Sequence, residues 1–263
     1  MGNRVKTTLL IDADILAYRV ASRFQKSYDF GDGEDPCVAV GELGEAQREC
    51  KLSMENVTDE LNADGFVVCL SDDNANWRKS VLPTYKGHRK DSVRPELLYP
   101  LKDYLANNFT SYRRPTLEAD DVMGIIATTP AILPGHRKII VSIDKDLKQI
   151  PGLLHNGTDL LTISKDEADW WHWMQMLTGD AVDGYKGCPG VGPVKAAAIV
   201  NEGPRNLMED IHGFSRWSRV VAAYIDKDLT EADALVQARV ARICRHEDYD
   251  FKKKEVRLWS PKE

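Results

Sequence analysis

Acidic residues stand directly after several short apolar runs of this 263-residue chain. Carboxylates at such positions can hold cations or transfer protons, and their recurrence is the first sign of chemistry in the sequence. The apolar runs and the acids that follow them are Thr7–Ile11 with Asp12, Phe66–Leu70 with Asp72, and Lys138–Ile143 with Asp144 and Asp146.

Two further acidic groups lie outside these runs. Glu118, Asp120 and Asp121 open an apolar helical segment, and Asp180 and Asp183 lie in a turn-rich stretch. Each acid alone fits a solvated loop or a favourable first helical turn. Brought together, they would repel one another unless cations neutralised them. Carboxylates without Cys or His indicate Mg²⁺ or Mn²⁺, and two such ions support phosphodiester hydrolysis.

The elements that position these acids follow from the pattern of the chain. The apolar runs are rich in β-branched residues and predict buried strands of a parallel sheet. Between them, Glu45–Asn62 and Glu118–Ala127 predict helices. The alternation predicts an α/β fold with a central, mostly parallel sheet flanked by helices. Since ligands bind beyond the carboxyl ends of such strands, we expect the acids at one edge of the sheet.

The strand signals end near residue 165. We therefore expect residues 1–165 to form the α/β domain and residues 166–263 a helical subdomain packed on it. Three tryptophans, Trp170, Trp171 and Trp173, begin the second part, and packing between the two parts is favoured over a platform for stacking on bases.

Charge is unevenly distributed in this acidic protein of net charge −6. Residues 78–114 carry nine lysines and arginines against three acids, a local charge of +6, which fits either a phosphate-binding strip or a solvated helix face. No apolar stretch approaches the roughly 20 residues that span a bilayer. The five widely spaced cysteines predict reduced thiols and a cytoplasmic protein without membrane contact.

A glycine-rich stretch, residues 187–193, precedes a short helical segment that carries Lys195. Gly190 and Gly192 let the backbone approach a phosphate, and a helix N-terminus offers free N–H groups. We expect this hairpin to grip a duplex by its backbone without reading bases.

Five ordered motifs resemble the flap endonuclease and 5′-nuclease family, which is PIN-like. The similarity is closest to the short stand-alone 5′→3′ exonucleases of tailed bacteriophages, and it extends to the N-terminal exonuclease domain of bacterial DNA polymerase I. The motifs are E-A-D-D at 118–121, S-x-D-K-D-L-x-Q at 142–149, G-D-x-x-D with a helix-hairpin-helix at 179–197, Y-K-x-x-R at 85–89, and the phage-type stretches 168–172 and 237–259.

The resemblance implies two Mg²⁺ (or Mn²⁺) ions. The first would be held mainly by Asp12, Asp72, Asp120 and Asp144, with Glu118 and Asp121 binding directly or through water. The second would be held by Asp146, Asp180 and Asp183, and Asp144 stays open as a ligand shared by both ions. Asp72 is chosen for its place at the strand end, and its neighbour Asp73 stays open as the alternative.

The basic strip would be the family's arch region, over which or through which the 5′ strand passes. Lys86 and Arg89 would stabilise charge on the scissile phosphate, and Arg78 and Lys79 would contact the DNA backbone. Tyr85 would stack on a base or pack at the base of the arch. The resemblance also implies a K⁺ ion at the hairpin.

The implied function is a metal-dependent 5′→3′ exonuclease acting on double-stranded DNA with 5′ ends or flaps, extending to flap cleavage and removal of RNA primers from an RNA–DNA hybrid. Three rivals stay open. A haloacid-dehalogenase-type phosphatase would use Asp12 as a covalent nucleophile. A PIN-type ribonuclease would lack the hairpin and the last third of the chain. A non-catalytic, structure-specific DNA-binding protein would not need the acids.

Overall fold

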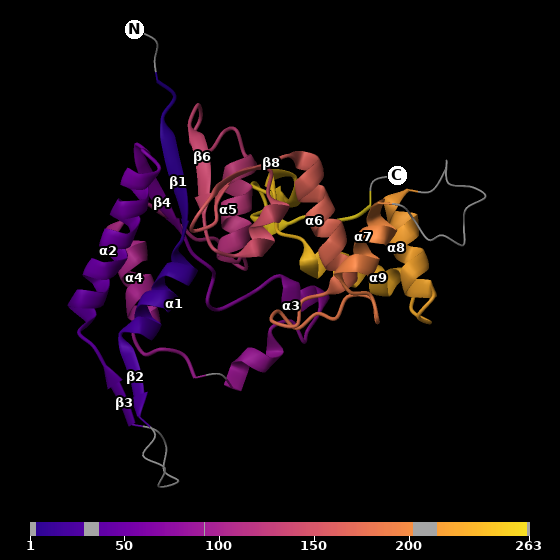
Figure 1. Cartoon of the computed structure of the whole chain (residues 1–263), viewed down its shortest axis with the longest axis horizontal. Helices are drawn as coiled ribbons and strands as arrows, with labels where there is room; N and C mark the ends of the chain where they lie inside the picture. The colour runs from indigo at the N-terminus through magenta and orange to yellow at the C-terminus, as the bar shows by residue number, and fades with distance from the viewer. Residues whose placement is uncertain (1–3, 29–36, 92, 202–214, 262–263) are drawn as a thin grey trace.

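The computed structural model describes residues 4–28, 37–91, 93–201 and 215–261, and a six-stranded sheet lies at its centre (Figure 1). Its order is β5-β4-β1-β6-β7-β8, in which only the last pair is antiparallel. The strands are β1 (Thr7–Asp12), β4 (Gly65–Cys69), β5 (Ser111–Tyr112), β6 (Arg137–Val141), β7 (Gly152–His155) and β8 (Leu160–Ile163).

The three central strands confirm the predicted parallel sheet. In β1 every residue is buried, because neighbouring strands and helices cover it on both sides. Successive side chains alternate between the faces: Leu9 joins one hydrophobic cluster, and Leu10 joins the other. Burying an aliphatic side chain stabilises a fold by about 1.5–3 kcal/mol, which explains why these strands are continuously apolar.

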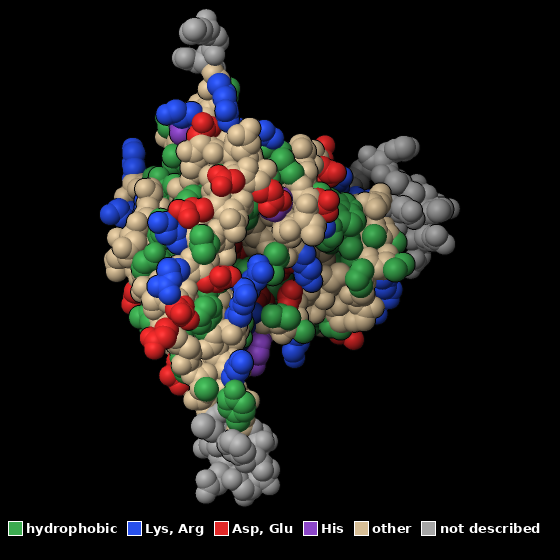
Figure 2. Space-filling view, turned by 60° about the vertical axis from the view of Figure 1, so that its left-hand side comes forward, with side chains coloured by type: hydrophobic (Ala, Val, Ile, Leu, Met, Phe, Trp, Pro, Cys, Tyr) green, Lys and Arg blue, Asp and Glu red, His purple; other side chains and the backbone are tan. Residues whose placement is uncertain are grey.

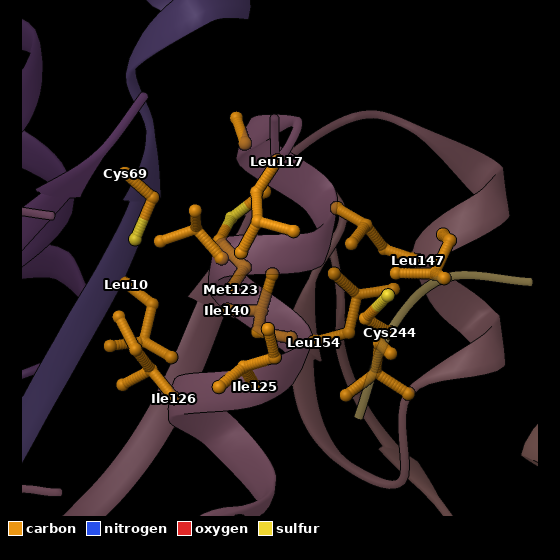
Figure 3. Packing of buried hydrophobic residues seen from close by; sticks show 14 of the residues in the cluster. Leu10, Cys69, Leu117, Met123, Ile125, Ile126, Ile140, Leu147, Leu154 and Cys244 are labelled. Carbon is orange, nitrogen blue, oxygen red and sulfur yellow. The ribbon is translucent and has the colours of Figure 1, made fainter. Parts of the chain in front are cut away.

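Helices cover both faces of the sheet (Figure 1). On one side, α1 (Ala13–Arg23), α2 (Leu43–Glu60) and α4 (Leu98–Asn108) pack against one another. On the other, the apolar helix α5 (Ala119–Thr128) places Met123 and Ile126 against Leu10 and Ile140, as Figure 3 shows. The expected helices over 45–62 and 118–127 are thus α2 and α5, shifted by one or two residues at their ends.

After β8 the chain is mainly helical. A separate hydrophobic cluster joins α6 (Lys165–Thr178), α7 (Pro193–Asn201), α8 (Arg216–Ile225) and α9 (Glu231–Ala241). Ser164 and Thr230 accept backbone hydrogen bonds in capping boxes, which fixes where α6 and α9 begin. Trp170 and Trp173 pack against this cluster, while Trp171 lies edge-on to Trp170 and beneath the ammonium of Lys148.

The chain after α9 runs back to the sheet (Figure 1). It contains the short element η4 (His246–Asp248) and the two-residue strands β9 (Tyr249–Asp250) and β10 (Glu255–Val256). Arg245, which is 2% exposed, donates to the Gln149 carbonyl at 2.6 and 3.0 Å and pairs with Asp169 of α6 at 2.6 Å. This segment therefore links the sheet to the helical part.

Several short elements have weak sequence signals and were not expected. β2 (Gln25–Tyr28) and β3 (Cys37–Val40) form a hairpin that projects below the sheet in Figure 1. The basic strip contains α3 (Arg78–Val81), η1 (Gly87–Asp91) and α4, and η2 (Lys145–Gln149) follows β6. Over the ranges given above, no helix has the length and apolar character needed to cross a membrane.

Candidate active site

A cleft of about 890 Å³ opens at the carboxyl ends of β1, β4 and β6. Figure 2 shows acidic and basic side chains next to one another around a hollow in this face. The structure brings every predicted acid except Asp121 to the lining of this one cleft. The acids that line it are Asp12, Asp14, Asp72, Asp73, Glu118, Asp120, Asp144, Asp146, Asp180 and Asp183.

Asp12 ends β1 and caps α1. Its carboxylate accepts hydrogen bonds from the Ile15 amide at 3.0 Å and from the Ser142 hydroxyl at 2.8 Å. The side chain is buried, and burial is the main reason why its pKa rises to about 7. The neighbouring charges of Asp14 and Asp144 raise the pKa further, while the two hydrogen bonds oppose the rise.

Asp120 and Asp146 share this environment. Burial and then the charges of Asp12 and Asp144 raise the pKa of Asp120 well above its usual value. Burial and the charges of Asp144 and Asp180 raise the pKa of Asp146 to about 7. Among the residues that the structure describes, none forms an ion pair with Asp12, Asp120 or Asp146. Within the described part of the chain, these three acids of the cleft are therefore not neutralised by an ion pair.

Asp180 and Asp183 reach the cleft on a tight loop. The backbones of Asp180 and Tyr185 exchange two hydrogen bonds of 2.8 and 3.1 Å, which close the loop. Gly179 and Gly187 make this closure possible, because both have positive φ (67° and 64°) and a Cβ on either would lie 2.3 Å from backbone atoms near the other.

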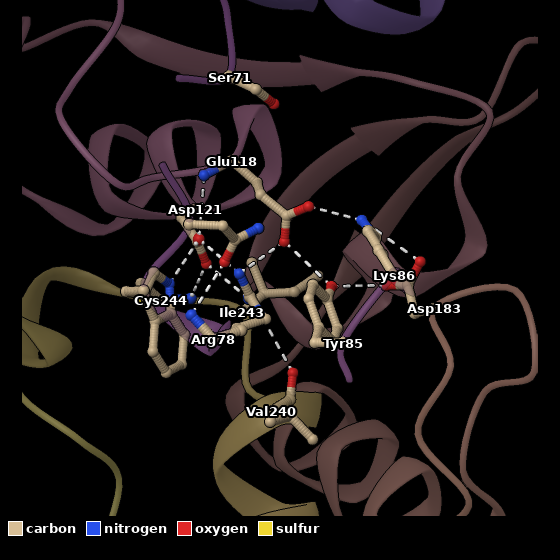
Figure 4. Close-up of polar contacts among 12 residues, drawn as sticks. Ser71, Arg78, Tyr85, Lys86, Glu118, Asp121, Asp183, Val240, Ile243 and Cys244 are labelled. Carbon is tan, nitrogen blue, oxygen red and sulfur yellow. Dashed lines mark hydrogen bonds and ion pairs between the residues drawn. The ribbon is translucent and has the colours of Figure 1, made fainter. Parts of the chain in front are cut away.

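The base of the basic strip contacts two of the acids (Figure 4). The Lys86 ammonium lies 2.5 Å from Glu118 and 3.3 Å from Asp183, and Arg89 lies 2.9 Å from Asp183. Burial alone would raise the pKa of Glu118, but Lys86 and Arg78 bring it down to about 2. The Lys86 amide also donates to the Asp183 carbonyl at 2.8 Å, so this loop and the strip are joined by backbone as well.

The geometry does not favour direct metal binding by Asp121. Asp121 is fully buried outside the cleft lining, and both its oxygens are occupied (Figure 4). One accepts from Arg78 at 2.8 Å and from the Cys244 amide at 3.0 Å. The other accepts from Arg78 at 2.7 Å and from the Trp77 indole at 3.0 Å. Asp121 therefore anchors neighbouring segments and has no oxygen left for an ion.

The expected phosphate contact of Arg78 is contradicted for the same reason. Its side chain is 3% exposed, and its guanidinium donates to Asp121, to Glu118 at 2.8 Å, and to the carbonyls of Val240 (2.9 Å) and Arg242 (2.6 Å). These contacts use all five N–H groups of an arginine. Arg78 thus fastens the start of the basic strip to α5 and to the C-terminal segment.

Tyr85 is not placed to stack on a base. It is 2% exposed, and its hydroxyl lies 2.8 Å from Asp183 and 3.0 Å from Glu118. The alternative role, packing at the base of the strip, agrees with this position. Lys79, by contrast, is exposed on α3 at the edge of the cleft, where a phosphate contact is sterically open.

The two acids after β4 have different partners. Asp72 accepts from the amides of Thr116 (2.8 Å) and Asn74 (3.0 Å), which outweigh its partial burial and lower its pKa. Asp73 instead pairs with Lys102 and lies 3.5 Å from Arg113. Because Lys102 and Arg113 already pair with Asp73, the geometry favours Asp72 as the acid that can bind a cation.

Sequence reasoning missed two residues of the cleft. Asp14 lies 2.9 Å from the Lys102 ammonium, and both line the cleft. The spacing of Asp14 to Asp12 was a signal for the first. Lys102 stood in the basic strip without any feature that set it apart, because only the packing of α4 buries it.

The hairpin stands as an exposed turn between α6 and α7. Gly190 has φ 71° and is exposed, as are Gly192 and Lys195. A Cβ on Gly190 or Gly192 would meet no atom within 4 Å, so the space above this turn is open. An approaching backbone could reach the N-terminus of α7 here.

The donor chemistry of the cleft fits hard cations, although the acids are not yet gathered around one point. Over the described part of the chain, no three His, Cys, Asp or Glu side chains are close enough together to hold one ion. Lys86 and Arg89 pair with two of the acids, Glu118 and Asp183. Burial first, and then neighbouring carboxylates, raise the pKa values of Asp12 and Asp146.

This fold and this acidic cleft belong to a known class. Residues 7–172 match the family described as 5′-3′ exonuclease, N-terminal resolvase-like domain. The match covers more than half of the chain, and the chain belongs to this family. It is an enzyme of the exonuclease and flap endonuclease class, which sets aside the phosphatase and the non-catalytic alternatives.

Among named relatives, the exodeoxyribonuclease of Enterobacteria phage T3 is 32% identical over 222 residues, 74% of each chain. The exonuclease of Escherichia phage T7 is 32% identical over 221 residues, again 74% of each. The flap endonuclease Xni of Vibrio campbellii is 31% identical over 206 residues, 70% of this chain and 75% of that protein.

Solved structures confirm the fold. The T5 D15 protein, co-crystallised with metal ions, superposes with a TM-score of 0.63 at 15% identity and covers 90% of this chain and 89% of its own. A second structure, the T5 D15 flap endonuclease in complex with DNA and metal ions, gives a TM-score of 0.57 at 14% identity.

Proposed function

We propose that this enzyme hydrolyses phosphodiester bonds at 5′ ends of duplex DNA with two divalent ions, Mg²⁺ or Mn²⁺, held in the acidic cleft. The observation that carries the proposal is that Asp12, Asp120 and Asp146 line one cleft with Lys86 and Arg89 and have no ion-pair partner among the described residues. A relative crystallised with metal ions, and with DNA, supports the same reading.

We assign the acids of the cleft to the ions by their place. Asp12, Asp72, Asp120 and Asp144 would hold the first ion, with Glu118 beside it, and Asp146, Asp180 and Asp183 the second. When bound, such ions make a water nucleophilic and stabilise the leaving oxygen. Asp121 is left out, because Arg78 and three other groups occupy its oxygens.

Lys86 and Arg89 act on the phosphate. Both sit at the rim of the acid group, where the phosphate of a bound strand would face them. Their charge would stabilise the additional negative charge that develops on the phosphate during hydrolysis. Lys79 would contact a neighbouring phosphate from its exposed position.

We place the duplex on the helical part. Residues 166–263 would form a helix-hairpin-helix subdomain in which Gly190, Gly192 and Lys195 meet the DNA backbone, and a K⁺ ion could be held by hairpin carbonyls. Contacts of this kind do not read bases, so 5′ flaps and RNA primers in a hybrid are within the proposed substrate range.

The test is cleavage of 5′-labelled blunt, flap and RNA–DNA duplexes in Mg²⁺ and in EDTA, with Asp144→Ala and Asp183→Ala. Both variants should lose cleavage and keep most duplex binding, because these acids hold ions and not DNA. Asp103→Ala, an exposed acid of α4, is the control and should cleave normally. Cleavage in EDTA, or equal loss of binding and cleavage, would overturn the proposal.

A further inference from the structure

Lys102 is a buried cation at the acidic cleft that the proposed chemistry does not use. It lies on α4, is 4% exposed and lines the cleft. Its ammonium contacts Asp14 at 2.9 Å and Asp73 at a hydrogen-bonding distance. Because desolvating an ammonium is costly, a lysine stays charged in such a place only when acids surround it closely.

The two partners of Lys102 belong to the strand ends that carry the proposed metal ligands. Asp14 lies two residues after Asp12, and Asp73 follows Asp72 directly. Asp14 also accepts from the Ser71 amide at 3.3 Å, so it touches the end of β4 as well as the start of α1. Lys102 therefore bridges the segments that follow β1 and β4 from a helix within the basic strip.

Without the Lys102 ammonium, the cleft would contain two carboxylates, Asp14 and Asp73, that the proposed ions do not neutralise. Asp14 lines the same cleft as Asp12, two residues further along the chain. Among the ion pairs of the described residues, the other basic partner of these two acids is Arg113, which lies 3.5 Å from Asp73. Carboxylate oxygens crowded in this way attract hard divalent cations.

We propose that Lys102 is a positioning residue that acts as a built-in cation. It neutralises Asp14 and Asp73, keeps them out of the metal-binding set, and holds α4 on the strand ends beside Asp12 and Asp72. The inference rests on the proposed metal site and defines which acids of the cleft the ions do not use.

The test counts Mn²⁺ ions bound per chain in the absence of DNA, by calorimetry and by the electron paramagnetic resonance of free Mn²⁺. Lys102→Met should bind one more Mn²⁺ than the wild type, since Asp14 and Asp73 lose their ammonium. Lys102→Arg keeps a cation and should bind the wild-type number. An unchanged number in Lys102→Met, or a gained ion in Lys102→Arg, would overturn the inference.

A second variant keeps the test decisive if Lys102→Met does not fold. Lys102→Met/Asp14→Asn/Asp73→Asn replaces the ammonium together with both carboxylates by uncharged groups of similar shape, and it should bind as many Mn²⁺ ions as the wild type. A lost ion would mean that these acids hold metal themselves. A wild type that binds no Mn²⁺ would instead contradict the proposed function, so the two failures are distinct.

Discussion

The acids of the cleft fall into two groups by their partners. Glu118 and Asp183 are paired with Lys86 and Arg89, whereas Asp12, Asp120 and Asp146 gather without such partners among the described residues. The first group links the basic strip to the site, and the second is available to cations. Asp121 belongs to neither, since its contacts fasten segments of the fold.

Asp121→Asn should destabilise the protein strongly. The change removes the charge that a buried Arg78 needs, and breaking a buried pair costs about 3–5 kcal/mol. Glu49→Gln breaks the exposed pair with Arg23, also 2.7 Å long, and should cost less than about 1 kcal/mol. Urea unfolding measures both, and similar losses in the two variants would contradict the anchoring role of Asp121.

Lys86→Met should slow cleavage more than it weakens binding. The ammonium faces the site where charge develops, and losing one such donor lowers kcat by roughly 10²-fold. Lys148→Met is the matched control, because Lys148 lies over Trp171 outside the cleft lining. Single-turnover cleavage measures the rate, and binding in Ca²⁺ measures the affinity for DNA. A drop in affinity as large as the drop in rate would mean that Lys86 acts only in DNA binding.

Among the elements, α5 contacts the site, the sheet and the C-terminal segment at once. It begins at Glu118 of the site, packs its apolar face on the sheet, and meets the C-terminal segment at Gly124. The absence of a side chain at Gly124 lets the backbone of Cys244 approach closely. This contact helps to hold the returning segment where Arg78 and Asp121 bind it.

Gly124→Ala should therefore destabilise the protein by about 1–3 kcal/mol. Its Cβ would lie 2.3 Å from the Cys244 carbonyl oxygen and 2.7 Å from the Ile150 side chain. Gly44→Ala on α2 meets only Arg48 at 3.9 Å and should be neutral or stabilise by up to about 1 kcal/mol. Thermal unfolding compares the two variants. An unchanged unfolding temperature in Gly124→Ala would show that the segment around Cys244 moves aside without loss of stability.

At the scale of the whole molecule, a chain of net charge −6 lines one cleft with both acidic and basic side chains. The cleft gathers the acids, while Lys79 and Lys195 are exposed at its edge and at the hairpin. Such an arrangement would let one site bind cations and phosphates together, despite the acidic balance of the protein.

Duplex binding should therefore weaken steeply with salt. Each phosphate neutralised by a lysine or arginine releases counterions, and the slope of log K against log salt is about −0.9 per contact on duplex DNA. Lys195→Met should make the slope shallower by about one contact, whereas Lys148→Met should leave it unchanged. A titration from low to moderate salt with Ca²⁺ measures these slopes, and a flat dependence would contradict backbone binding by this surface.

The sequence by itself determined the sheet and most of the cleft. Continuous apolar strands can be buried only between helices, and the carboxyl ends of parallel strands share one edge, so acids after those strands had to meet. Short elements such as the β2–β3 hairpin gave too little pattern to be predicted.

Only the tertiary structure decided which charges pair. Asp120 and Asp121 are neighbours in the E-A-D-D motif, yet one faces the cleft and the other is fully buried against Arg78. Lys102 and Lys79 both lie in the basic strip, yet one is buried between two acids and the other is exposed. Helix packing fixes which side of each element meets solvent, and pairing depends on distances that residues far apart in the chain acquire only on folding.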